Sequence, residues 1–191
     1  MDTVYNLSNL QFYVNSGHKV KYLFFWGHKE SGSQVTKACF SQWYDAPFEH
    51  NGIKYLTAEH FMMAEKARLF NDAKNLQQIL NATNPGEAKK LGRAVVNFDD
   101  KIWNAEREKI VVEANLLKFS QNPELKTFLL QTGDRVLVEA SPVDRIWGIG
   151  MAQDDENIYN PNLWRGQNLL GFALMKTREI LKSNLTNTVT T

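Results

Sequence analysis

The stretch from Thr57 to Ala67, TAEHFMMAEKA, marks a change in the hydrophobic pattern from strand-like to helical. Thr57 is a suitable N-cap residue, and the residues after it predict a helix that continues to about Phe70. This apolar segment also carries two charged residues, Glu59 and Lys66. Seven residues advance a helix by about 700°, so the two side chains share one side, with Cα atoms about 10.5 Å apart.

The spacing of Glu59 and Lys66 leaves a gap that a ligand could fill, because a direct ion pair is favoured at a spacing of three or four residues. Apolar surroundings lower the pKa of a lysine toward that of a neutral nucleophile, and the helix dipole stabilises a carboxylate in the first turn. The alternative is a solvated face that also carries Glu65 and Arg68. The spacing by itself leaves both interpretations open.

The segments on either side of this helix predict an α+β protein in which helices dominate. Strands are expected at 21–27 and 135–140, and a hairpin at 48–55 around Asn51-Gly52. Further helices are expected from Asp72 to about 80, from Asn84-Pro85 onward, from Asp99 or Asp100 to about 120, from Asn122 to about 133, and after Asn168. We therefore predict a predominantly helical, compact single domain with a small β-sheet or hairpin.

The length and composition agree with one domain. The chain has 191 residues, of which 43% are hydrophobic, enough to bury a single core. Residues 1–20 and 183–191 are polar with weak periodicity. We expect a loose N-terminal segment at 1–20, one domain at 21–182 and a disordered tail at 183–191.

The charge and cysteine content limit the partners and the compartment. A formal net charge of +1 gives no large field toward nucleic acid or membranes. The single cysteine, Cys39, cannot form an internal disulfide, and the first residues lack a secretory pattern. No apolar run approaches the roughly 18 residues of a membrane span. The sequence predicts a cytoplasmic protein with no membrane association and no evident obligate protein partner.

No metal site is predicted. The four histidines are scattered through the sequence, without the spacing of zinc ligands. The acidic run at 154–156 lacks the alternating oxygen ligands of a calcium loop, and a solvated turn is the simpler interpretation.

A second candidate site lies in the segment 137–150, LVEASPVDRIWGIG. A strand would deliver Glu139, the turn would present Asp144, and Trp147 precedes two glycines, Gly148 and Gly150, that let backbone approach a ligand. An aromatic plane beside carboxylates suits a nucleobase. The alternative is a core tryptophan with Glu139 paired to an arginine.

A third set of candidates is basic. Lys89, Lys90, Arg93 and Arg165 are available for phosphate oxygens, which the fork of an arginine suits best. Surface lysines on a helix commonly serve solvation, so Arg93 is the preferred candidate.

The order of these motifs resembles the NADAR family, also called YbiA-like, from about Tyr22 to Leu181. The resemblance rests on residues 40–70 (FSQWYDAPFEHNGIKYLTAEHFMMAEKARLF), on residues 84–150 (from NPGEAKKLGR to DRIWGIG) and on residues 164–179 (WRGQNLLGFALMKTRE). It implies a mostly helical α+β domain and an N-glycosidase acting on a ribosyl C1′–N bond. The substrates implied are ADP-ribosylated guanine in DNA or a nucleotide, or phosphoribosylamino intermediates of riboflavin biosynthesis. No cofactor is expected.

The resemblance also implies the site residues. The family motifs fall on Glu59, His60, Lys66, Trp103, Glu139, Asp144, Trp147, Gly148, Gly150, Gly166, Asn168 and Gly171. One departure is Gln42, where the family often has asparagine, so the edge of the pocket and the base preference are expected to differ.

The mechanism expected from these residues places a carboxylate near C1′ and a proton donor near the base. The predicted catalytic residues are Glu59, Lys66 and Asp144, with Lys66 as a Schiff-base nucleophile or a proton donor. The predicted substrate-binding residues are Trp26, Trp43, His60, Arg93, Trp103, Glu139, Trp147, Gly148, Gly150 and Asn168.

Two other classes of protein are compatible with the sequence. One is a module that binds ADP-ribose or NAD without cleaving it, through Trp147 and Arg93. The other is a nucleic-acid-binding protein that uses DKIWNAEREK at 101–110, although interspersed charges do not suit a phosphate-tracking surface.

Overall fold

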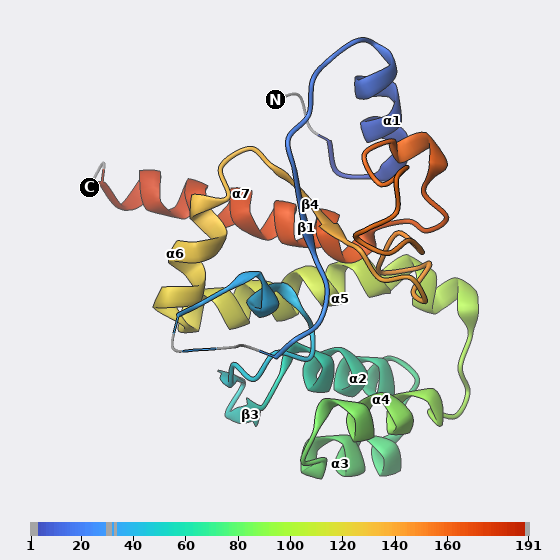
Figure 1. The fold of residues 1–191 in the computed structure, drawn as a ribbon. Helices are drawn as coiled ribbons and strands as arrows, with labels where there is room; N and C mark the ends of the chain where they lie inside the picture. Colours follow the sequence, from blue (N-terminus) through green and yellow to red (C-terminus); the bar gives the residue numbers. More distant parts are fainter. Residues whose placement is uncertain (1–3, 30–31, 33, 190–191) are drawn as a thin grey trace. The chain divides into compact units, whose positions relative to one another are not determined.

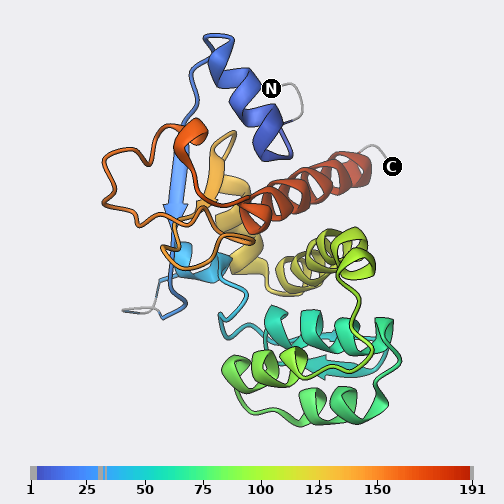
Figure 2. The ribbon, with the colours of Figure 1, turned by 90° about the vertical axis from the view of Figure 1, so that its right-hand side faces the viewer.

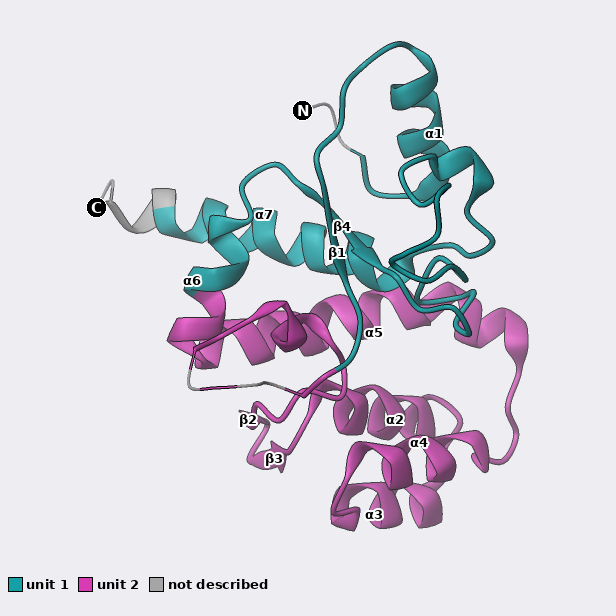
Figure 3. Cartoon of the chain, in the orientation of Figure 1, with its two compact units in different colours: residues 1–27, 127–191 teal, residues 28–126 magenta. Residues whose placement is uncertain are grey.

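The computed structural model describes residues 4–29, 32 and 34–189 and forms two compact units (Figure 3). Unit 1 comprises residues 1–27 and 127–191, and unit 2 comprises residues 28–126. The described residues form seven α-helices and two sheets of two strands each. This confirms the predicted α+β, predominantly helical fold class.

Unit 2 is built around one central helix. Its elements are the 3-10 helix η1 (Lys37–Phe40), the strands β2 (Phe48–His50) and β3 (Ile53–Tyr55), and the helices α2 (Ala58–Leu69), α3 (Ala73–Asn81), α4 (Pro85–Arg93) and α5 (Asp100–Gln121). Helix α2 packs against α3, α4 and α5, and the helices α2, α3 and α4 lie side by side (Figures 1 and 2). Because neighbours surround it, α2 is buried over most of its length, which explains why its sequence has no polar face.

Local capping begins the helices of unit 2 where the sequence predicts. The side chains of Thr57, Asp72, Asn84 and Asp99 each accept a backbone N–H in the first turn of the helix that follows. The hairpin turns at Asn51-Gly52, where both residues have positive φ (51° and 74°), as a type I′ turn requires.

Unit 1 contains the parallel strand pair. Its elements are α1 (Leu7–Asn15), β1 (Tyr22–Phe25), the part of α6 (Pro123–Gln131) from Thr127 onward, β4 (Val136–Glu139), the 3-10 helix η2 (Pro161–Leu163) and α7 (Leu169–Val189). Strand β1 pairs in parallel with β4, from Tyr22 opposite Val136 to Phe25 opposite Glu139. Helix α7 packs on β4, and Leu170, Phe172 and Leu174 are buried.

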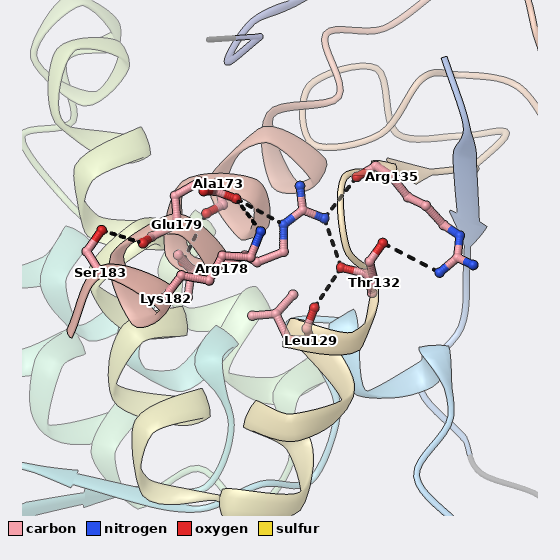
Figure 4. A network of polar contacts seen from close by, with 9 residues as sticks. Leu129, Thr132, Arg135, Ala173, Arg178, Glu179, Lys182 and Ser183 are labelled. Atoms are coloured by element: carbon pink, nitrogen blue, oxygen red, sulfur yellow. Dashed lines mark hydrogen bonds and ion pairs between the residues drawn. The ribbon is translucent and has the colours of Figure 1, made fainter. Parts of the chain in front are cut away.

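A buried arginine holds α7 to the turn that leads into β4 (Figure 4). The Arg178 side chain, 2% exposed, donates to Thr132 Oγ1 at 2.8 Å and to the Arg135 carbonyl oxygen at 2.9 Å. The Thr132 hydroxyl in turn donates to the Leu129 carbonyl oxygen at 2.6 Å. These bonds satisfy carbonyl groups at the end of α6 and in the turn after it, and so fix the start of β4. The other end of β4 carries Glu139.

Both ends of the chain contain more helix than the sequence predicts. The segment at 1–20, expected to be loose, contains α1, which is capped by Asn6 and anchored by Leu10, a fully buried side chain. Residues 183–189, expected to be a disordered tail, continue α7, and the Ser183 hydroxyl donates to the Glu179 carbonyl oxygen at 3.0 Å. Once packing stabilises a helix, further residues join it by adding one backbone hydrogen bond each, even where their intrinsic helix propensity is low. Residues 1–3 and 190–191 of these two predicted segments lie outside the described residues.

Candidate functional site

Lys66 is half-buried and lies among aromatic and carbonyl groups. Its Nζ donates to the Gly92 carbonyl oxygen at 2.9 Å and lies 4.2 Å from the centroid of the Phe98 ring. The Trp103 ring centroid is 5.5 Å from the same nitrogen. A carbonyl oxygen and two ring faces all favour the ammonium form.

The pKa of Lys66 is nevertheless lowered from its usual value of 10.5, chiefly because burial removes water from the ammonium. Asp100 opposes this change, and the positive charge of Arg93 reinforces it. Two other predicted site residues of unit 2 thus lie near Lys66. Trp103 faces its ammonium, and Arg93 is close enough for its charge to affect the pKa of Lys66.

The hydrogen bond of the Lys66 amine reaches a residue of α4 that packs beside the preceding turn of α2. Its acceptor, Gly92, packs against Met63, one turn nearer to Glu59, so closely that a Cβ at Gly92 would collide with the Met63 side chain. This direction agrees with the tilt of helical side chains toward the N-terminus.

Glu59 is 3% exposed and lies in the first turn of α2. Its backbone N–H donates to the Gln42 carbonyl oxygen at 3.0 Å, so the loop at 41–43 sets the position of this turn. A carboxylate here is stabilised by the helix dipole.

The loop that contacts Glu59 is held by helix α5. The Asn115 side-chain amide donates to Gln42 Oε1 at 3.0 Å and to the Val111 carbonyl oxygen at 2.8 Å. Lys118, three residues further along, is completely buried, and burial lowers its pKa to about 8. Asn115 and Lys118 were not predicted as site residues, although both fall on the buried stripe of α5 at helical spacing.

His60, a predicted substrate-binding residue, has both ring nitrogens engaged within unit 2. Nε2 donates to the Ala82 carbonyl oxygen at 3.2 Å, which leaves Nδ1 to accept the Thr57 hydroxyl at 2.8 Å. The ring is 2% exposed, and burial lowers its pKa. These contacts favour a structural role at the start of α2.

Trp43 lies half-buried over the beginning of α4. Its ring packs near Gly86, and the Lys89 ammonium lies 5.7 Å from the ring centroid. Arg93, the last residue of α4, is exposed.

The second group of predicted residues forms the loop after β4 in unit 1. Asp144 Oδ1 accepts the backbone N–H groups of Ile146 and Trp147, each at 2.8 Å. The Asp144 carbonyl oxygen accepts the N–H of Gly150, whose φ is 65°. A side chain at Gly148 would press on the Glu139 carbonyl oxygen at 2.8 Å. Asp144 and the two glycines thus set the course of this loop.

Asn168 attaches the start of α7 to the edge of β4. Its Oδ1 accepts the Glu139 N–H and its Nδ2 donates to the Leu137 carbonyl oxygen, both at 2.9 Å. The side-chain amide therefore pairs with β4 as the backbone of another strand would. Asn168 is completely buried and has φ of 55°. These contacts favour a positioning role over direct contact with a substrate.

Glu139 and Trp26 lie at the same end of the parallel strand pair. Phe25, opposite Glu139, ends β1, and Trp26 follows it with 59% of its surface exposed. Trp147 in the neighbouring loop is half-buried.

The part of the chain that the structure describes holds no cluster of three or more His, Cys, Asp or Glu residues suited to a metal ion. Within the same residues, none of the helices combines the length and the apolar character needed to cross a membrane.

Comparison with known proteins identifies the family. The NADAR domain model matches residues 24–182, which run through both units. N-glycosidase R617 of Acanthamoeba polyphaga mimivirus is 47% identical over 165 residues, covering 83% of this chain and 95% of that protein. N-glycosidase YbiA of Escherichia coli is 32% identical over 142 residues, covering 74% and 78%.

A solved structure gives the same result. The NMR structure of the Escherichia coli protein YbiA is similar to this fold with a TM-score of 0.71 and 27% identity, covering 88% of this chain and 89% of that one. The match of the family model and the identity to its members confirm the resemblance found in the motifs. The chain belongs to the NADAR family.

Proposed function

We propose that this protein is an N-glycosidase that hydrolyses a ribosyl C1′–N bond, with ADP-ribosylated guanine, in DNA or a nucleotide, as the preferred substrate class. The names of its relatives support a hydrolase that acts on N-glycosyl bonds. The observation that carries the proposal is on α2, where a partly desolvated Lys66 amine and the buried Glu59 belong to the same helix. A phosphoribosylamino intermediate of riboflavin biosynthesis is the second substrate class.

Cleavage of this bond builds positive charge on the sugar and negative charge on the departing base. Glu59 supports the sugar cation and accepts a proton from water as the water oxygen bonds to C1′. The electron pair of the broken bond leaves with the base nitrogen, which takes a proton from the Lys66 ammonium. Glu59 is preferred to Asp144 for this role because Asp144 Oδ1 already accepts two backbone N–H groups.

The alternative role for Lys66 is covalent. A neutral Lys66 amine would attack C1′ as the C1′–N bond breaks and its electron pair leaves with the base. Loss of a proton from the attached amine and opening of the ring, with a proton taken up at O4′, would then give a Schiff base. The lowered pKa supports the neutral amine as well. The carbonyl and aromatic contacts of Nζ favour the ammonium and thus the proton donor. Borohydride added during turnover separates the two roles, since only the imine leaves a stable adduct on Lys66.

The test of the proposed function is release of free base from three purified substrates: ADP-ribosylated guanosine, ADP-ribosylated DNA and a phosphoribosylamino pyrimidine. Glu59→Gln should reduce the rate on the order of 10²-fold or more. Glu65→Gln is the matched control, because Glu65 lies on the same helix and pairs with Arg68. A folded, fully active Glu59→Gln variant would remove Glu59 from the mechanism.

The same experiment tests the alternative of a binding module. Heat on mixing with ADP-ribose or NAD, together with no release of base from any of the three substrates, would show binding without cleavage and overturn the proposed activity.

A further inference from the structure

Most of the exposed apolar side chains of unit 2 lie around the start of α5, and one of them contacts Lys66. Among its described residues, the large hydrophobic side chains that are exposed are Leu56 (37%), Val96 (54%), Phe98 (40%) and Ile102 (48%). Three of these four lie on the short connection from α4 to α5 and in the first turn of α5. Such a concentration on an otherwise polar surface is typical of a binding site.

Phe98 is the exposed aromatic residue of this group. The other described phenylalanine, tyrosine and tryptophan side chains of unit 2 are buried or half-buried. The Phe98 ring packs edge to face on Phe70, with centroids 5.2 Å apart and planes at 62°. This contact fixes the orientation of a ring that is still open to solvent.

The Phe98 ring also contacts the proposed proton donor, since its centroid is 4.2 Å from Lys66 Nζ. Trp103 is farther from the same nitrogen, at 5.5 Å, and is half-buried. Because the ammonium lies over the ring itself, a flat aromatic group would rest on the part of that face that Lys66 leaves open, with its edge toward the ammonium.

We propose that Phe98 is the platform on which the departing nucleobase stacks, with Ile102 extending the apolar surface beside it. The ligand class is a planar heteroaromatic base, a purine before a pyrimidine because a larger ring covers more of the platform. The inference rests on the proposed function, since it places the departing base of that reaction on the Phe98 ring, next to Lys66. Phe98 is thereby a residue that determines specificity.

The test compares Phe98→Leu, which keeps apolar volume but removes the ring, with Phe98→Trp, which keeps a stacking face. The matched control is Phe12→Leu, the same change at an exposed phenylalanine on α1. The substrate is ADP-ribosylated guanosine, and guanosine is the product-like inhibitor.

The expected result is a roughly tenfold rise in KM and in the guanosine inhibition constant for Phe98→Leu, which corresponds to about 1.4 kcal/mol. Phe98→Trp should stay within about threefold of the wild type in both constants, and its pH–rate profile should be unchanged, because an aromatic ring still faces Lys66. Thermal unfolding checks that the variants are folded.

Two results would overturn the proposed stacking role of Phe98. One is a folded Phe98→Leu variant with wild-type KM and inhibition constant. The other is a lower kcat with a shifted pH–rate profile in both variants, which would mean that Phe98 acts through the protonation of Lys66. If the wild type releases no base, the proposed function fails, and calorimetry of guanosine with wild type and Phe98→Leu still tests the stacking separately.

Discussion

The ammonium of Lys118 lies 2.6 Å from the carbonyl oxygen of Cys39, in a part of unit 2 where the lysine side chain has no exposed surface. The same nitrogen donates to the Ser41 carbonyl oxygen at 2.9 Å. A buried cation that bonds two carbonyl groups fastens η1 and the loop after it to α5. The next residue along, Gln42, accepts the N–H of Glu59, so this contact supports the proposed catalytic turn.

Lys118→Met should destabilise unit 2, because it keeps the volume of the side chain but removes the hydrogen bonds that the ammonium donates to two carbonyl oxygens, one of them in a buried contact. Each such loss costs about 1–3 kcal/mol, and relief from burying a cation offsets part of it. Urea denaturation measures the change, and Lys109→Met, at an exposed position on the same helix, should stay within about 0.5 kcal/mol of the wild type. Equal stability of the two variants would contradict the structural role of Lys118.

The free energy of unfolding of the wild type should rise with pH in the range where Lys118 is protonated in the unfolded chain but neutral in the folded one. Burial lowers the pKa of Lys118 from 10.5 to about 8, so between these values the unfolded state binds more protons than the folded one. The free energy of unfolding contributed by this group therefore increases from about pH 8 upward and is lowest below pH 8. Denaturation at pH 7, 8, 9 and 10 should show a steeper rise for wild type than for Lys118→Met, and parallel curves would refute the assignment.

Gly92→Ala should separate α4 from α2, because the added methyl group would collide with the Met63 side chain. Forced overpacking costs about 1–3 kcal/mol, and the same shift would move the carbonyl oxygen that holds Lys66. The double variant Met63→Ala/Gly92→Ala makes room for the methyl group and should recover part of the loss in a double-mutant cycle. If the changes in the free energy of unfolding of the two single variants simply add in the double variant, the side chains at positions 63 and 92 do not contact each other.

Asn168→Gly should destabilise unit 1, because it allows the positive φ but removes both side-chain hydrogen bonds to β4. Two bonds of about 0.5–1.5 kcal/mol each predict a loss of about 1–3 kcal/mol. Asn168→Asp should cost more, since it places a carboxylate oxygen against the Leu137 carbonyl oxygen. Asn97→Gly is the matched control, at an exposed asparagine with φ of 56°, and a similar loss there would assign the effect to backbone freedom alone.

The elements of the fold were predictable to the extent that their signals are local. Thr57 and Asp72 cap the helices that they were expected to cap, and Asn51-Gly52 forms the expected hairpin turn. A cap or a tight turn depends on a few neighbouring residues, and these are visible in the sequence. Helix at 7–15 and at 183–189, within segments expected to be loose or disordered, was not predicted, because these helical residues depend on packing as well as on propensity.

The sequence by itself therefore determined the helical α+β class, the start of most helices and the motifs that indicate the NADAR family. Only the tertiary structure decided which polar side chains serve the fold. It gave His60 and Asn168 buried partners, buried Lys118 completely and set Phe98 against Lys66. The reason is physical: a polar or aromatic side chain acquires its role from the groups packed around it, and these come from segments far away along the chain.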